Sequence, residues 1–287
     1  MILKLCRFVS PEGGTRVGCI REDGQVVDLT EAGIVDLAAL LEADEPATVV
    51  SDYLQAHPDV APVARARLLP PVEGQEIWAA GVTYLRSKAA RMEESDFSAT
   101  AYDRVYVAAR PELFFKCAPG KAVGPDEAVG IRRDARWSVP EPELALVLNS
   151  RGRVVGFTIG NDMSSRDIEG ENLLYLPQAK IYNRSCALGP WIVVGVGESS
   201  AREWRITIEI ERAGVVVFSG ETVAGQLRRS FDELAEYLFR SQRFPAGVVL
   251  LTGTGIVPPD QFTLAAGDEV RIRINGIGLL RNPVVVV

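Results

Sequence analysis

Two glutamates lie two residues apart just before one of the most apolar segments of the chain. The segment is VPEPELALVL, residues 139–148, and the glutamates are Glu141 and Glu143. Side chains two apart on a β-strand point to the same face, so both carboxylates are expected to face one way. The apolar residues that follow indicate a buried strand. The chemistry to which such a pair points is the binding of a cation.

A third carboxylate is predicted to join this pair from the next strand. The segment RVVGFTIGND follows the turn-like residues NSRG. If Asn149 pairs with Gly152 in a hairpin, Asp162 lies opposite Val139, beside the two glutamates. Three converging carboxylates repel one another in a partly desolvated site unless a cation compensates them. An all-oxygen ligand set without His or Cys favours Mg²⁺, Mn²⁺ or Ca²⁺ over zinc, whereas spacing alone leaves a solvated strand end open for the glutamates.

The composition restricts the class of protein and its partners. The 287 residues include 31 basic and 38 acidic ones, for a net charge of -7, and the basic residues are scattered. We therefore expect no nucleic-acid partner. Apolar runs fall short of the roughly 18 residues of a membrane-spanning helix, so we expect no membrane insertion. The four cysteines form no C-x-x-C pair and no charged-then-apolar leader is seen, which predicts reduced thiols and a cytoplasmic location.

The N-terminal part of the sequence predicts a small separate domain. Strand-like segments, MILKLCRFV, VGCI and QVVDL, are followed by the helical patterns IVDLAALLEA and TVVSDYLQA. Pro70 and Pro71, with the polar stretch VEGQE, then resist both a helix and a central strand. We expect an N-terminal α+β domain over residues 1–72 and a second domain over residues 73–287.

The second domain is predicted to be mainly β. The alternating segment WRITIEI, the turn Ala213-Gly214 and the segment VVVFS predict a hairpin, and DEVRIRI before Asn275-Gly276 predicts another. A helix is predicted after Ser230, which forms a capping box with the glutamate three residues later.

Several longer strings resemble those of the fumarylacetoacetate hydrolase family. They are PEPELALVL, GFTIGNDMSSRDIEGENLLYLPQAK and LLTGTG, and the likeness covers roughly residues 77–287. It implies an α+β, mainly β fold, in which a mixed β-roll catalytic domain surrounds a divalent metal behind a smaller N-terminal domain. By this resemblance Glu141, Glu143 and Asp162 are the metal ligands. It also implies a small-molecule substrate and a homodimer or homotetramer.

The chain departs from the hydrolases of that family at one motif. Those enzymes carry N-Y-x-x-H-x-x-E, where His and Glu activate water, but here the matching segment TYLRSKAA has Ser87 and Ala90 at those positions. The sole histidine, His57, belongs to the small N-terminal domain. Instead, GVTYLRS, VYVAARPELFFK and IEGENLLYLPQAK resemble a branch that dehydrates 2-keto-3-deoxy sugar acids. The absent dyad favours elimination of water over hydrolysis.

The resemblance implies a specific reaction, in which a 2-keto-3-deoxypentonate, such as 2-dehydro-3-deoxy-D-arabinonate, becomes 2,5-dioxopentanoate. The cation would chelate the substrate carboxylate and carbonyl and acidify the C3 protons. Lys180 matches the family lysine and is the predicted base; a Schiff base through Lys180, or a surface pair with Glu169 or Glu171, are its alternatives. Glu112, at the start of an apolar strand, is the predicted acid for the leaving hydroxyl, and a surface charge is its alternative.

Further residues are predicted to bind the substrate. A guanidinium can grip a carboxylate with two parallel hydrogen bonds, which makes Arg86 the most suggestive of them. The full set is Arg86, Ser87, Lys116, Thr252 and Thr254. Structural roles remain open for these residues: a surface ion pair for Arg86, the core for Lys116, and a tight turn for the threonines. A hydrolase or decarboxylase of acylpyruvate-like diketo acids, and a ligand-binding protein without catalysis, are the alternative functions.

Overall fold

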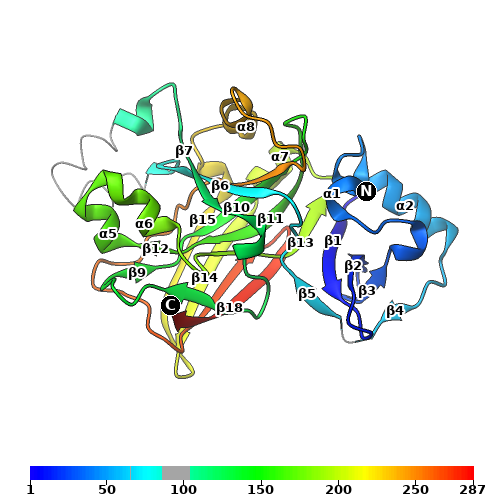
Figure 1. The fold of residues 1–287 in the computed structure, drawn as a ribbon, viewed down its shortest axis with the longest axis horizontal. Helices are drawn as coiled ribbons and strands as arrows, with labels where there is room; N and C mark the ends of the chain where they lie inside the picture. Colours follow the sequence, from blue (N-terminus) through cyan, green and yellow to red (C-terminus); the bar gives the residue numbers. More distant parts are fainter. Residues whose placement is uncertain (65, 86–103) are drawn as a thin grey trace.

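The computed structural model describes residues 1–64, 66–85 and 104–287. Figure 1 shows a small lobe, which is built from N-terminal residues and coloured blue, beside a larger lobe that holds the C-terminus. Among the helices in these ranges, none is both long and apolar enough to cross a bilayer.

The small lobe combines short strands with helices, as its sequence pattern predicts. Helix α1 follows Asp36, whose carboxylate accepts a hydrogen bond from the Ala39 N–H at 3.0 Å and so caps the helix. Helix α2 begins with Pro46, at a position where the missing N–H needs no partner. The elements are β1 (Leu3–Val9), β2 (Thr15–Ile20), β3 (Val26–Asp28), η1 (Thr30–Ala32), α1 (Leu37–Leu41), α2 (Pro46–Ala56), β4 (Pro62–Val63) and β5 (Arg67–Leu69).

A mixed sheet runs through both lobes in the order β4-β3-β2-β1-β13-β11-β10-β16-β6-β7. Strand β1 pairs antiparallel with β13, so that Leu5 lies opposite Ile192. The hydrogen-bonded sheet therefore continues across the boundary predicted between residues 72 and 73, which stays a prediction. The strands of the larger lobe in this sheet are β6 (Glu76–Gly81), β7 (Glu112–Cys117), β10 (Pro142–Leu148), β11 (Val154–Asp162), β13 (Cys186–Val194) and β16 (Val248–Leu251).

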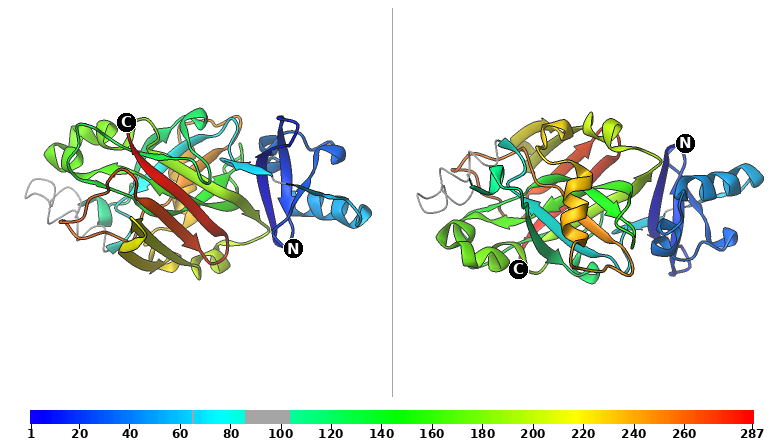
Figure 2. Two further views of the ribbon diagram at one scale, coloured as in Figure 1. Left: turned by 90° about the horizontal axis from the view of Figure 1, so that it is seen from below. Right: turned by 90° about the horizontal axis from the view of Figure 1, so that it is seen from above.

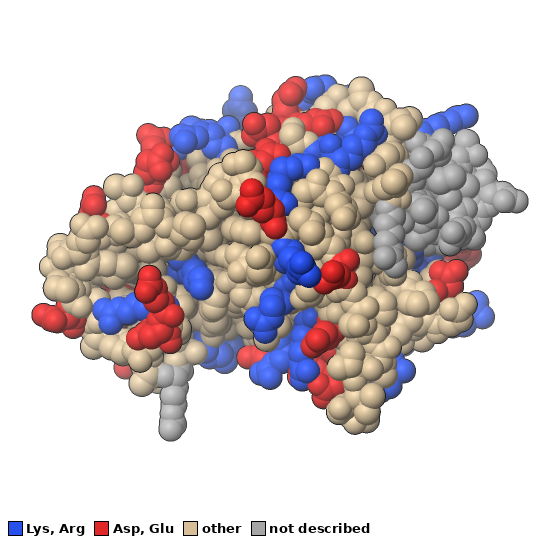
Figure 3. Space-filling model, turned by 180° about the vertical axis from the view of Figure 1, so that it is seen from behind, with Lys and Arg blue, Asp and Glu red and all other residues tan. Residues whose placement is uncertain are grey.

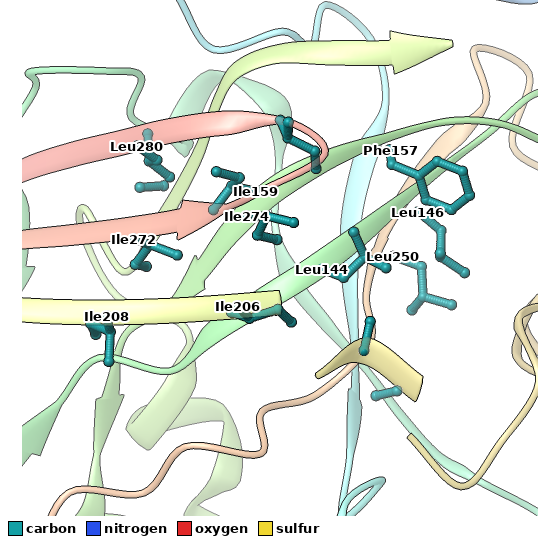
Figure 4. Packing of buried hydrophobic residues seen from close by; sticks show 14 of the residues in the cluster. Leu144, Leu146, Phe157, Ile159, Ile206, Ile208, Leu250, Ile272, Ile274 and Leu280 are labelled. Carbon is teal, nitrogen blue, oxygen red and sulfur yellow. The ribbon is translucent and has the colours of Figure 1, made fainter. Parts of the chain in front are cut away.

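A second sheet packs against the first and closes the core of the larger lobe. Its order is β15-β14-β17-β18-β8. Figure 4 shows the aliphatic residues of both sheets pointing toward one another, with Leu144, Leu146 and Ile159 on one side and Ile206 and Ile272 on the other. The strands are β8 (Val129–Ile131), β14 (Arg205–Arg212), β15 (Val215–Val223), β17 (Glu269–Ile274) and β18 (Gly278–Val286).

The local predictions for this lobe are confirmed. Strands β14 and β15 form a hairpin whose turn residues Ala213 and Gly214 both have positive φ, 50° and 81°, as a two-residue turn requires. Strands β17 and β18 form the second hairpin. Helix α8 (Phe231–Phe239) is capped by Ser230, whose side chain accepts a hydrogen bond from the Glu233 N–H at 3.1 Å. Seen from above in Figure 2, this helix crosses the strands of the first sheet.

The end of the larger lobe that lies away from the small lobe carries short irregular elements. Figures 1 and 2 show α5 and α6 there in every view. They follow strand β11 directly in the chain, so the end of that strand and both helices are close in space. The elements not yet given are β9 (Ser138–Val139), β12 (Ser164–Ser165), α5 (Arg166–Glu171), η3 (Leu173–Tyr175), α6 (Leu176–Lys180), η2 (Pro119–Lys121), α7 (Glu198–Arg202) and η4 (Ala224–Gln226).

Charges of both signs are interspersed on the molecular face drawn in Figure 3. On the second sheet they form ion pairs between neighbouring strands. Arg205 lies 2.9 Å from Glu221, and Arg271 lies 2.6 Å from Glu211. Exposed pairs of this kind contribute little stability, about 0–1 kcal/mol each, and serve mainly to keep the outer sheet face polar.

Candidate metal centre and catalytic cavity

The β10–β11 hairpin brings Asp162 to the two glutamates, but in a register that differs from the predicted one. An Asn149–Gly152 pair would place Asp162 opposite Val139. Instead, Asn149 donates its N–H to the Arg153 carbonyl at 3.0 Å, and a bulge between Val147 and Leu148 shifts the strands further. The predicted register is therefore wrong, because a longer turn and a bulge both intervene.

The observed register strengthens the predicted cluster. The Asp162 N–H donates to the carbonyl of Glu141 at 3.0 Å, so these two residues lie directly opposite each other. Glu141, Glu143 and Asp162 are 6, 1 and 1% exposed, and each offers an oxygen within 4.8 Å of the others. A solvated strand end is thus excluded for the glutamates. All-oxygen ligands that converge in this way fit a hard divalent cation.

Lysine and arginine side chains also contact two of the three carboxylates, those of Glu141 and Asp162. The ammonium of Lys180 donates to Glu141 Oε2 at 2.7 Å, to Asp162 Oδ2 at 3.0 Å and to the Ser164 hydroxyl at 2.6 Å. Arg166 Nη1 lies 3.3 Å from Glu141 Oε1. Lys116, a fully buried residue of β7, forms a further ion pair with Asp162. These side chains therefore compensate part of the carboxylate charge, in addition to any bound metal ion.

Glu143 differs from the other two carboxylates. It accepts a hydrogen bond from the backbone N–H of Gly253, and no lysine or arginine of the described ranges lies within ion-pair distance of it. Burial raises the pKa of Glu143 well above its usual range, and the negative charges of Asp162 and Glu141 raise it further. A cation held by all three groups would relieve this unfavourable charge, so the residues present fit a divalent metal.

Glycine is required at position 253 for this contact. Gly253 has a φ of 93°, and a Cβ there would lie 2.0 Å from the hydroxyl oxygen of Thr83. Because L-residues avoid this backbone region and no space is left for a side chain, only glycine can direct its N–H at Glu143. The LLTGTG string thus contributes a backbone donor to the site.

Two of the carboxylates, Glu141 and Asp162, line a cavity. Lys180 and Glu112 both line it, which brings the predicted base and acid together. Glu112 is the first residue of β7 and pairs with Gly81, where a Cβ would lie 2.2 Å from Glu112 Oε2. The remaining lining residues include Val82, Phe114, Val139, Arg166, Glu169, Leu176, Thr254, Ile256, Val257 and Pro258.

The structure separates the predicted substrate-binding residues. Thr254 lines the cavity, whereas the hydroxyl of Thr252 is buried and donates to the Leu144 carbonyl at 2.8 Å. Lys116 is fully buried behind the cavity wall, with its ammonium directed at protein atoms, a position that does not support the predicted contact with substrate. Arg86 and Ser87 lie outside the described residues.

Sequence reasoning missed other polar groups of this cavity. Arg166 and Glu169 lie on α5, three residues apart, so they project from the same side of the helix. Both are buried and line the cavity, at 3 and 4% exposure. Arg166 belongs to the motif N-D-M-S-S-R-D, which leaves both a functional role and an internal ion pair open for it.

The fold and the buried carboxylate cluster define a class of protein. Residues 76–285 match the model described as fumarylacetoacetate (FAA) hydrolase C-terminal, so the chain belongs to this family, and the resemblance seen in its motifs is confirmed. A Haloferax volcanii protein named as a probable 2-keto-3-deoxyxylonate dehydratase is 46% identical over 264 residues, which cover 92% of this chain and 86% of the relative.

Two further comparisons point to the same branch. The 2-dehydro-3-deoxy-D-arabinonate dehydratase of Saccharolobus solfataricus is 42% identical over 221 residues, 76% of this chain and 74% of that protein. A solved structure of a 2-keto-3-deoxy-D-arabinonate dehydratase complexed with magnesium and 2,5-dioxopentanoate superposes with a TM-score of 0.82 at 35% identity, covering 99% of both chains. The predicted α+β, mainly β fold of this family is confirmed.

Proposed function

We propose that the protein is a divalent-metal-dependent hydro-lyase that converts a 2-keto-3-deoxypentonate, such as 2-dehydro-3-deoxy-D-arabinonate, to 2,5-dioxopentanoate and water. The observation that carries the proposal is the meeting of the carboxylate cluster with Lys180 and Glu112 in one cavity. The named dehydratases among its relatives support the same reaction.

Glu141, Glu143 and Asp162 are the proposed ligands, and Mg²⁺ is the proposed ion, because a related structure is described with magnesium. Mn²⁺ and Ca²⁺ use the same oxygen ligands. When bound, such an ion supplies Lewis acidity toward a 2-keto acid, which makes the C3 protons easier to remove. Because such an ion binds the 2-keto acid end of the substrate, the position of the cluster would determine how the substrate lies in the cavity.

Lys180 is the proposed base that removes a proton from C3. Its nitrogen faces the cavity and contacts Glu141 and Asp162, so it is held beside the proposed ligands. Three acceptor oxygens surround this nitrogen, and it can accept the C3 proton only as the neutral amine, after one of its own protons has passed to a neighbouring carboxylate or to water. A neighbouring hydroxyl, that of Ser164 at 2.6 Å, gives the amine a fixed partner on the cavity floor.

Glu112 is the proposed acid that protonates the departing C4 hydroxyl. It enters the cavity from β7, whereas Lys180 enters it from α6, so the two groups can act on adjacent carbons of one bound molecule. Loss of the C3 proton and the C4 hydroxyl releases one water. The resulting C3=C4 double bond then moves to C4=C5, as one proton leaves C5 and another is added at C3. The enol so formed transfers its hydroxyl proton to C4, which gives the aldehyde of 2,5-dioxopentanoate.

Assembly and location are also proposed. The family likeness supports a homodimer or homotetramer, which light scattering coupled to gel filtration measures. Cys6, Cys19, Cys117 and Cys186 are all buried free thiols. These thiols support a reducing compartment, and we propose the cytoplasm.

The test of the function is to incubate the purified protein and Mg²⁺ separately with 2-keto-3-deoxypentonates of each C4 configuration and with acetylpyruvate. Proton NMR should show 2,5-dioxopentanoate from at least one pentonate, and EDTA should abolish its formation until Mg²⁺ is added back. Acetate and pyruvate from acetylpyruvate, without any dioxopentanoate, would instead establish a hydrolase. Full activity in EDTA would contradict the metal and favour a Schiff base on Lys180.

A further inference from the structure

Strand β7 carries a lysine that the proposed reaction does not use. Glu112 and Phe114 lie on one face of this strand because side chains alternate, and both line the cavity. Lys116 follows at an irregularity of the β6–β7 pairing, between Phe115 opposite Trp78 and Cys117 opposite Ile77, with 0% of its surface exposed. A lysine is almost never fully buried unless it is paired. Lys116 therefore lies beneath the cavity floor in a position that requires specific partners.

The ammonium of Lys116 is surrounded by acceptor oxygens of the protein. It forms an ion pair with Asp162 Oδ1, and it donates to the carbonyl oxygens of Met163 at 3.0 Å and Lys180 at 2.5 Å. An ammonium offers three donors and no acceptor, so two of its hydrogens are held by these carbonyls while its charge is paired with the carboxylate.

These partners belong to two different elements of the site. Asp162 and Met163 stand at the end of β11, whereas Lys180 is the last residue of α6. Asp162 Oδ2 already contacts the ammonium of Lys180, so Lys116 holds the opposite oxygen of the same carboxylate. One side chain thus joins a proposed metal ligand to the backbone of the proposed base.

We propose that Lys116 is a positioning residue, which orients Asp162 toward the metal and holds the backbone of Lys180 beside it. The inference rests on the proposed function, in which Asp162 binds a cation and Lys180 accepts a proton. Metal ligands keep their geometry through hydrogen bonds from neighbouring groups, and loss of such a group weakens metal affinity or activity by about 10-fold to 100-fold. Lys116 holds one ligand and one reacting residue, so both properties depend on it.

The experiment compares Lys116→Met, which keeps the length of the side chain but removes its donors, with Lys121→Met. Lys121 is exposed and follows the same strand, so it is the matched control. Binding of Mn²⁺ is measured by electron paramagnetic resonance in the absence of substrate, folding by circular dichroism, and kcat and KM at saturating Mg²⁺. We expect the dissociation constant for Mn²⁺ to rise about 10-fold to 100-fold in Lys116→Met and to stay unchanged in Lys121→Met.

A kcat that remains reduced at saturating Mg²⁺ would support the second part of the role, the placement of Lys180. A folded Lys116→Met protein with wild-type Mn²⁺ affinity and wild-type kcat would overturn the proposal and leave Lys116 as a core residue. Replacement of a core residue would lower the melting temperature without changing Mn²⁺ affinity or kcat.

If Lys116→Met does not fold, Lys116→Arg decides the question. Arginine keeps the charge beside Asp162, but its planar fork cannot place donors where three separate acceptors need them. We expect a folded protein with weakened Mn²⁺ binding and reduced kcat, and wild-type values for both would again overturn the role. The Mn²⁺ titration involves no substrate, so it still decides the role of Lys116 if the wild-type protein fails to dehydrate any 2-keto-3-deoxypentonate.

Discussion

The two ends of strand β10 lie in the same buried sheet but differ completely in chemistry. Leu144, Leu146 and Leu148 face one apolar cluster, and Ala145 and Val147 face another, so both surfaces of this half of the strand are covered by hydrocarbon. At the other end, Glu141, just before the strand, lines the cavity, and Glu143 is buried beside it. Burial is nearly complete in both halves, and only the partners differ.

The difference teaches which part of the strand supplies stability and which part supplies chemistry. Removal of apolar area from water stabilises the apolar part of the strand by about 25 cal/mol for each Å². Burial of charged groups opposes folding unless they are paired, so the carboxylates need Lys180, Arg166 and Lys116 as partners. Glu143 remains the group whose charge is least compensated. A cluster of this kind is expected to be functional because it does not serve the stability of the fold.

The largest expected effect is a loss of catalytic activity at Glu112 that leaves stability and metal binding unchanged. Replacement Glu112→Gln keeps the size of the side chain but removes the acid, and general acid catalysis contributes about 10²-fold to 10⁴-fold. We expect kcat for the 2-keto-3-deoxypentonate to fall by that factor, while Mn²⁺ affinity and the melting temperature stay at wild-type values. Loss of Mn²⁺ binding in this variant would show instead that Glu112 belongs to the metal site.

The second prediction addresses the apolar half of β10. Leu146 is fully buried beside Phe157 and Leu250, as Figure 4 shows, and Leu146→Ala should lower the free energy of unfolding by about 2–5 kcal/mol. Urea unfolding measures this loss, and Leu174→Ala, at a side chain that is 83% exposed, is the control. The folded variant should keep its Mn²⁺ affinity. A Leu146→Ala protein that is as stable as the control would contradict the assignment of this half to the core.

The smallest effect concerns Glu143, and its sign depends on pH. Because the pKa of Glu143 is raised in the folded chain, the unfolded chain loses its proton first, and the contribution of Glu143 to metal-free stability falls as pH rises above about 4.5. Glu143→Gln removes this loss, so we expect the variant to equal the wild type at low pH and to exceed it at neutral pH in EDTA.

Urea unfolding of both proteins in EDTA, at pH values below and above that window, checks the sign. The same substitution should weaken Mn²⁺ binding, so stability and metal affinity move in opposite directions. A stability difference between Glu143→Gln and the wild type that does not grow through the window would contradict the uncompensated charge on Glu143.

Much of the site could be predicted because its signals are local in sequence. The spacing of Glu141 and Glu143 places them on one face of any strand, and a hairpin of any reasonable register brings Asp162 near them. The error of register, from Val139 to Glu141 as the residue opposite Asp162, came from a bulge that leaves no clear mark in the sequence. The three carboxylates nevertheless lie together, because every plausible register places them at the same open end of the hairpin.

Contacts between distant segments could not be predicted. The Gly253 N–H on Glu143 and the Lys116 ammonium on Asp162 join residues that only the pairing of strands brings together. The pairing of β1 with β13, which links the small lobe to the larger one by hydrogen bonds, is of the same kind. Each depends on the final arrangement of the sheet.

The sequence by itself determined the two hairpins, the capped helix, the family of the chain and the carboxylates of its site. These features depend on residue type and spacing within short segments, where backbone geometry leaves few alternatives. The tertiary structure decided which cations approach the carboxylates, that Lys116 lies beneath the cavity rather than in it, and that Glu143 is left with a raised pKa. Desolvation and charge act through space, so their balance is set only when the whole fold has closed around the site.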